Sequence, residues 1–236
     1  IGMNHLYRLV SESHINYFYR QPRIPRTLLE KFREGLIIGS ACEAGELYQA
    51  ILDGADENKL KEIANFYDYL EIQPLGNNQF LIDSGRVKSV EELQEYNKII
   101  INLAQQLGKP VVGTGDVHFL HPRDSIYRQI LMQGQGFEDA DKQPPLYFRT
   151  TEEMLAEFAY LGPEMAREVV IVNPAKILEQ VEDVKPLPDE FCPPEIPGAE
   201  EEIRQMSYER AREWYGDPLP KLVEDRLEWE LKSIID

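Results

Sequence analysis

The spacing of apolar residues predicts short strands that alternate with helices. A short apolar run predicts a buried strand at residues 35–41, and two further strands are predicted at 66–74 and 110–116. Apolar residues at helical spacing predict helices at about 43–53, 56–67 and 89–107. This alternation favours parallel βαβ units and therefore an α/β fold. Three strands are too few to close a barrel, so either the fold is small and open or further strands lie outside the chain.

Helices are also expected at both ends of this pattern. Residues 4–19 carry Leu6, Leu9, Val10, His14 and Tyr17 at helical spacing. Short helices are expected at 27–34 and 123–132, and helices dominate from Thr151 onward.

The 89–107 segment has the clearest end signals. Ser89, with Glu92 three residues later, is typical of a capping box. Gly108 followed by Pro110 is typical of a helix end.

Residues 184–198 contain five prolines and predict an extended linker or surface strap. We expect a domain boundary near 185. The last stretch, 199–235, is expected to form two helices separated by Gly216-Asp217-Pro218.

The charge excludes some functions. The 236 residues carry a net charge of −17, and no cluster of Lys and Arg is visible, so we do not expect this chain to hold a DNA duplex. Its two cysteines, Cys42 and Cys192, favour a reducing interior over a disulfide framework. No apolar run approaches the ~20 residues needed to span a bilayer. The chain does not open with Met or with a signal peptide, so we expect it to be part of something longer.

The strongest local motif is GTGDVHF, residues 113–119, at the end of the third predicted strand. Sites in α/β folds assemble at the carboxyl ends of parallel strands. Asp116 and His118, at i and i+2 in an extended backbone, would point the same way and could bind one divalent cation. The alternative is a tight turn in which Asp116 caps the loop and His118 packs.

Other candidates have stronger structural alternatives. Cys42 follows the first predicted strand and is either a metal ligand or a small buried hydrophobe. His14 lies on an apolar helix and is either a ligand or a packing residue. Glu71 could be a ligand, a base or the partner of an arginine, and Asp68 and His121 have weaker claims. Glu43 and Glu46 favour a helix N-terminus. No phosphate-binding loop, nucleophile elbow or HExxH zinc motif is present.

Several segments, in order, resemble a known family. These are LVSESHINYFYRQPRIPR, GLIIGSACEAGEL, FYDYLEIQP, KPVVGTGDVHF, FRTTEEML and EIPGAEEEIRQMSYERAREWYG followed by LEWELKSII. They are similar to the C family of bacterial replicative DNA polymerases, in the PolC-type alpha subunit. The likeness covers the later part of the PHP domain and the start of the palm.

The resemblance implies a fold and a domain division. Residues 1–185 would be the C-terminal part of a PHP domain, a distorted (β/α)7 barrel, whose other strands precede residue 1. Residues 186–236 would be a proline-rich linker and the helical start of the palm. An exonuclease of the DEDD type interrupts the PHP domain in this family, and the chain would begin after it.

The resemblance also implies a site and partners. Asp116 and His118 match the last PHP motif, Cys42 falls at a strand end where relatives have His or Cys, and His14 falls near another ligand. The first motif, H-x-H, is absent. The site would hold divalent zinc, manganese or iron, and the parent polymerase would use magnesium. DNA, deoxynucleoside triphosphates, the sliding clamp and other replisome subunits are the expected partners, in the cytoplasm and without a membrane.

Two other functions stay open. A free-standing PHP phosphoesterase or 3′–5′ exonuclease would need a complete ligand set, and four histidines are few for that. A non-catalytic scaffold would use the two terminal helices as a docking surface.

Overall fold

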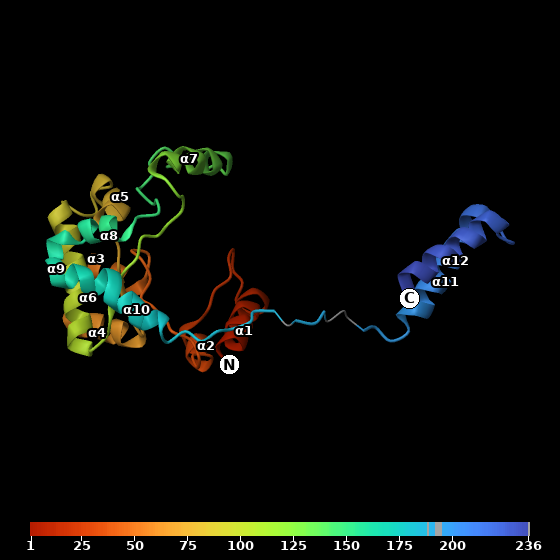
Figure 1. Ribbon diagram of the computed structural model, residues 1–236, viewed down its shortest axis with the longest axis horizontal. Coiled ribbons are helices and arrows are strands. Elements are labelled where there is room, and N and C mark those ends of the chain that lie inside the picture. The colour runs from red at the N-terminus through yellow and green to blue at the C-terminus, as the bar shows by residue number, and fades with distance from the viewer. Residues whose placement is uncertain (188, 192–194, 236) are drawn as a thin grey trace. The chain divides into compact units, whose positions relative to one another are not determined.

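The computed structural model describes residues 1–187, 189–191 and 195–235. The chain divides into two compact units, Ile1–Val184 and Lys185–Asp236 (Figure 1). Cys192 and three of the prolines in the 184–198 segment lie outside the described residues.

The sheet of the first unit has two parallel strands, β1 (Leu70–Ile72) and β2 (Val111–Gly113). Leu70 lies opposite Val111 and Ile72 opposite Gly113. The second and third predicted strands are therefore present, although shorter than expected, because α4 extends to Phe66. The result is a mixed α/β unit in which helices predominate.

The prediction of a buried strand at residues 35–41 is wrong. Only Gly39 pairs there, through one parallel bridge to Tyr69. Ile37 is 37% exposed, so the run is not a buried one. Asp68 binds the backbone of Ile38 on both sides, with its amide donating to the Ile38 oxygen and its carboxylate accepting from the Ile38 amide. The segment follows the edge of β1 without forming a strand.

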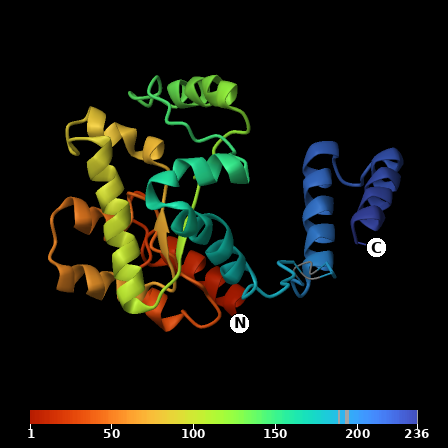
Figure 2. The ribbon, with the colours of Figure 1, turned by 60° about the vertical axis from the view of Figure 1, so that its left-hand side comes forward.

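The longest helix, α6 (Val90–Leu107), packs along both strands and against α4 (Figure 2). The oxygen Oγ of Ser89 accepts from the Glu92 amide at 3.4 Å. Glu92 in turn accepts from Lys88, not from Ser89, so only half of the expected capping box forms. Gly108 ends the helix in the left-handed conformation, as predicted. The buried side of α6 carries Leu93, Ile100, Leu103 and Ala104 into the core.

The first unit also contains shorter helices. They are α1 (Gly2–Ile15), α2 (Arg26–Lys31), α3 (Glu46–Leu52), α4 (Glu57–Phe66), α5 (Gln79–Asp83), α7 (Ser125–Gly134), α8 (Thr151–Glu157), α9 (Pro163–Arg167) and α10 (Asn173–Leu178). Single turns of 3-10 helix lie at Leu75–Asn78, Pro122–Asp124 and Ala159–Leu161, and Glu168–Val172 is a π-helical turn. None of the residues of α2, α7 or α8 is buried, and α7 is the longest of these three helices.

The second unit contains α11 (Ala199–Tyr215) and α12 (Lys221–Ile235), which pack on each other. Ala211 and Leu231 are its buried apolar residues. Arg204 pairs with Glu228 at 3.1 Å across the two helices. A groove of about 1140 Å³ between them is largely apolar and includes Met206 and Trp214. No helix among the described residues has the length and hydropathy required to cross a bilayer.

Candidate metal site

Polar side chains meet where the two strands end. The hydroxyl of Thr114 donates to Glu71 Oε1 at 2.6 Å, which links the segment after β2 to β1. The amide of Glu71 donates to Ser40 Oγ at 3.0 Å. Glu71 therefore joins three neighbouring chain segments. Its partner is a threonine, and not the arginine considered as one alternative.

The loop after β2 turns sharply at Asp116, whose φ is 49°. The backbone is therefore not extended there, contrary to the geometry expected for the D-x-H pair. The turn still brings the two side chains together, with Asp116 Oδ1 3.8 Å from His118 Nδ1. Both are accessible, since 42% of the Asp116 side chain and 41% of the His118 side chain is exposed.

The tautomer of His118 follows from its backbone contact. Its Nδ1 lies 2.8 Å from the carbonyl oxygen of Asp116. A carbonyl oxygen can only accept, so Nδ1 carries the proton and donates. The lone pair of the neutral ring is then on Nε2, the arrangement in which many histidines bind metals.

A neighbouring segment holds this loop in place. The amide of His118 donates to the Leu146 oxygen at 2.8 Å, and Phe119 and Tyr147 form a parallel bridge. Arg149 lies three residues after Leu146, and its side chain is only 1% exposed. The Nε atom of Arg149 donates to Glu157 Oε1 at 3.0 Å. Its guanidinium lies 4.6 Å from the centre of the Tyr147 ring. This ion pair of the buried Arg149 anchors the segment, and no sequence pattern indicated it.

A pocket of about 380 Å³ opens beside His118. Its lining residues come from this loop and from α7: His118, Phe119, Asp124, Tyr127, Arg128 and Leu131. The guanidinium of Arg128 donates to Gln143 Oε1 at 2.6 Å, and this hydrogen bond holds its positive charge in place beside the pocket.

Cys42 is partly buried just after the Gly39 bridge. Burial raises the pKa of its thiol. A hydrogen bond with the backbone of Ala44 lowers this pKa in part, and the charge of Glu43 raises it again. The thiol is therefore protonated near neutral pH, and a metal would have to displace the proton to bind sulfur.

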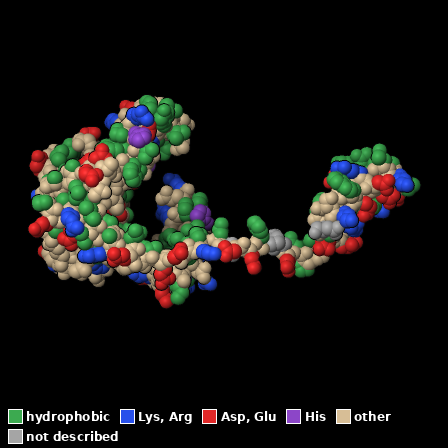
Figure 3. Space-filling model, in the orientation of Figure 1, with side chains coloured by type: hydrophobic (Ala, Val, Ile, Leu, Met, Phe, Trp, Pro, Cys, Tyr) green, Lys and Arg blue, Asp and Glu red, His purple; other side chains and the backbone are tan. Residues whose placement is uncertain are grey.

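His14 is exposed near the end of α1, with its Nδ1 2.8 Å from the Val10 oxygen. By the same reasoning it donates from Nδ1 and keeps Nε2 free. Figure 3 shows histidine side chains in two separate places, one beside α7 and one near α1, with open space between them.

The donors suit a divalent cation, but the set is incomplete. Asp116 offers a carboxylate and His118 a free Nε2, which match the preferences of zinc, manganese and iron. Within the described part of the chain, no group of three or more His, Cys, Asp or Glu side chains could hold a metal ion. The structure thus joins Asp116 to His118 and brings neither Cys42 nor His14 to them.

The weaker candidates have structural partners. Asp68 pairs with Arg33 at 2.8 Å in addition to its contact with Ile38. The amide of His121 donates to Asp124 at 2.9 Å at the start of a 3-10 turn. Thr114, which reasoning from the sequence missed, is the residue that holds Glu71.

Comparison with known proteins shows what the chain is similar to. The family model of the PHP domain matches residues 1–83 of this chain. PolC-type DNA polymerase III of Clostridium perfringens is 58% identical over 235 residues, which are 100% of this chain and 16% of that protein. PolC-type DNA polymerase III of Caldanaerobacter subterraneus subsp. tengcongensis is 61% identical over 100% of this chain and 17% of that protein. PolC-type DNA polymerase III of Bacillus subtilis is 49% identical over 99% of this chain and 16% of that protein. The chain spans less than a fifth of the curated relatives it matches. The expected resemblance is therefore confirmed: from end to end, this chain is similar to one segment of PolC-type DNA polymerase III.

Proposed function

We propose that this chain is part of a bacterial replicative DNA polymerase that synthesises DNA in chromosome replication. The observation that carries the proposal is the likeness of the whole chain, at 58% identity, to a segment of PolC-type DNA polymerase III. The parent protein would act on DNA and deoxynucleoside triphosphates with magnesium. It would work in the cytoplasm with the sliding clamp and other replisome subunits.

Within that parent, residues 1–185 would complete the C-terminal part of a (β/α)7 PHP barrel, and 186–236 would lead into the palm. The division at Val184 supports this assignment. Asp116 and His118 would bind a divalent zinc, manganese or iron ion. Cys42, His14 and residues from outside the chain would supply the other ligands.

A free-standing phosphoesterase or exonuclease is less well supported. Such an enzyme needs a full ligand set, and among the described residues Asp116 and His118 are not joined by a third His, Cys, Asp or Glu side chain that could hold a metal ion with them. The scaffold alternative has one observation in its favour, the apolar groove between α11 and α12. That groove is equally expected of a segment that continues into a larger domain.

The mass of the native gene product, together with a primer-extension assay, tests the proposal. We expect a protein several times longer than 236 residues that extends a primer with deoxynucleoside triphosphates. A complete native product of about this size, or a long product without primer extension, would contradict it.

A further inference from the structure

The segment between α1 and α2 forms a tight exposed turn. The amide of Tyr19 donates to the Gln21 oxygen at 3.1 Å, and the two residues form an antiparallel bridge. Arg20 lies at the tip with a φ of 61°, a left-handed conformation. Every residue from 16 to 24 is exposed. We call residues 17–23 the aromatic–arginine turn.

Three consecutive aromatic rings are exposed in this turn. Tyr17 is 42% exposed, Phe18 56% and Tyr19 60%. Large apolar faces on the surface of a protein are typical of binding sites. Flat rings in particular provide platforms on which unpaired bases stack.

Cations accompany the rings. The guanidinium of Arg20 lies 5.6 Å from the Tyr19 ring centre, and that of Arg23 lies 5.1 Å from it. In Figure 3, Lys or Arg side chains and hydrophobic side chains gather on this projecting segment. Each turn arginine is thus held beside an aromatic face.

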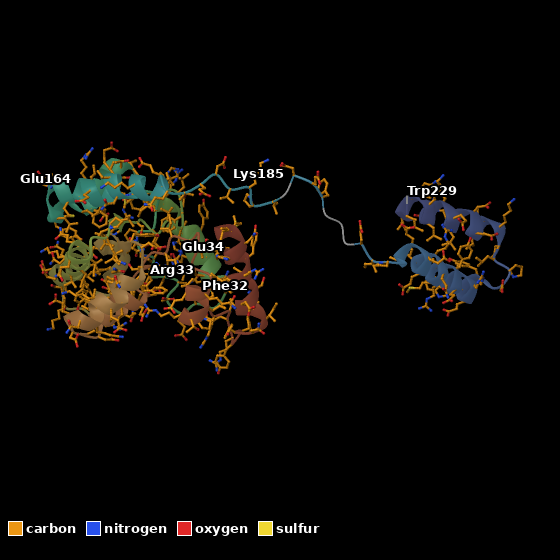
Figure 4. All side chains as sticks on the ribbon, turned by 90° about the horizontal axis from the view of Figure 1, so that it is seen from below. Phe32, Arg33, Glu34, Glu164, Lys185 and Trp229 are labelled. Carbon is orange, nitrogen blue, oxygen red and sulfur yellow. The ribbon has the colours of Figure 1, made fainter. Side chains whose placement is uncertain are left out.

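The charge of the segment is opposite to that of the chain. Residues 13–29 contain no Asp or Glu, in a chain whose net charge is −17. Arg26 and Arg33 have carboxylate partners, Glu46 at 3.6 Å and Asp68 at 2.8 Å. Figure 4 labels Arg33 beside Phe32, near the end of α2. Among the described residues no ion pair involves Arg20 or Arg23, so both charges are available to a ligand.

We propose that the aromatic–arginine turn binds single-stranded DNA. Phosphates would pair with Arg20 and Arg23, and a base would stack on Tyr19 or its aromatic neighbours. A duplex hides the faces of its bases, so single strands should bind better. The proposal requires neither a metal ion nor polymerase activity, and it can fail without affecting the proposed function.

The test measures the anisotropy of a fluorescent 12-nucleotide oligodeoxythymidylate with the whole 236-residue chain, in EDTA and at concentrations at which sedimentation shows the chain to be monomeric. Arg20→Gln with Arg23→Gln should weaken binding about tenfold. The slope of log K against log salt should fall in magnitude by about 1.4, since each neutralised phosphate of a single strand contributes about 0.7. Lys59→Gln with Lys61→Gln removes the same charge from the exposed side of α4 and should change neither quantity.

A second pair of variants separates stacking from charge. Tyr19→Phe keeps a ring and should bind like the wild type, whereas Tyr19→Leu should bind about fivefold or more weakly. Circular dichroism shows whether each variant is folded. The proposal is overturned if the wild type binds no single strand or binds duplex equally well. It is also overturned if the lysine control loses as much affinity as the arginine variant, or if the arginine changes abolish only self-association, which would mark a protein interface.

Discussion

At the scale of single residues, the candidate ligands differ in how ready they are to bind a cation. His118 and His14 each donate from Nδ1 to a carbonyl oxygen, so their Nε2 atoms are available. Cys42 is the opposite case, because burial and Glu43 raise the pKa of its thiol. Metal binding at sulfur would release a proton and would weaken as the pH falls.

We therefore predict that Cys42 reacts slowly with iodoacetamide near neutral pH. The thiolate is the nucleophile, and a raised pKa reduces its fraction. The rate should increase with pH up to a midpoint above that of free cysteine. Peptide mass spectrometry separates Cys42 from Cys192, and the urea-unfolded chain provides the reference. A rate at pH 7 equal to that of the unfolded chain would show that the environment of Cys42 does not protect it.

Buried amides form a second residue-scale feature, below the end of β1. Asn97 is 1% exposed. Its side-chain amide donates to the backbone carbonyl oxygen of Gln73 at 3.2 Å and to the Tyr160 hydroxyl at 2.7 Å. Burial raises the pKa of Tyr160 to about 12, so this hydroxyl stays protonated at neutral pH.

Asn97→Leu should lower the free energy of unfolding by about 1–3 kcal/mol. Leucine has a similar size but leaves the Gln73 oxygen and the Tyr160 hydroxyl without this donor. Asn65→Leu, the same change on the exposed side of α4, should alter stability by less than about 0.5 kcal/mol. Urea unfolding measures both, and equal effects at the two sites would refute the role assigned to Asn97.

At the scale of elements, close packing of β2 positions the loop that follows it. A Cβ atom at Gly113 would lie 2.7 Å from Cε2 of Phe158, a side chain with no exposed surface. Because the Phe158 ring is enclosed by the core, it cannot move aside easily.

Gly113→Ala should therefore destabilise the chain by about 1–3 kcal/mol. It should also weaken metal binding by the parent protein, since Asp116 follows three residues later. Gly134→Ala is the matched control, because nothing lies within 4 Å of its added carbon and alanine favours a helix. Thermal unfolding compares the two, and a neutral Gly113→Ala would contradict the close packing inferred here.

The helices could be predicted from the sequence because their signals are local. The period of apolar residues and the caps at Ser89 and Gly108 lie within α6 and beside it. The strands are only three residues long, and their pairing depends on distant segments. Residues 35–41 have the composition of a buried strand, yet only Gly39 pairs, and a Cβ atom at Gly39 would collide with the Tyr69 ring.

The candidate metal site was likewise predictable only where its residues lie close together in the sequence. Asp116 and His118 are two residues apart, so their proximity follows from local geometry, even though the backbone at Asp116 forms a turn and is not extended. Placing Cys42 or His14 beside them depends on the long-range fold. Periodicity in a single sequence does not contain that information, nor does it indicate the Arg149–Glu157 pair.

At the scale of the whole molecule, apolar surface is left uncovered. No residue of α7 is buried, and Ile126 and Ile130 are 49% and 57% exposed. In the parent protein we expect other segments to cover this face. Alone, the 236-residue chain should self-associate.

Sedimentation velocity over a range of concentrations measures this association. Ile126→Glu with Ile130→Glu should reduce it, because the pair removes apolar surface and adds repulsion. Gln129→Glu with Gln133→Glu adds the same charges to the same helix and should reduce it less. A monomeric wild type with a cooperative unfolding transition would show that the chain needs no other segment.

The most direct measurement is the metal content of the parent protein, by elemental mass spectrometry. It compares the wild type with Asp116→Asn/His118→Ala and with a control on the same loop, Asp124→Asn/His121→Ala. We predict near-stoichiometric zinc, manganese or iron in the wild type and in the control, and its loss from the Asp116/His118 variant. A wild type without metal, or a variant that retains it, would contradict the assignment of Asp116 and His118 as ligands.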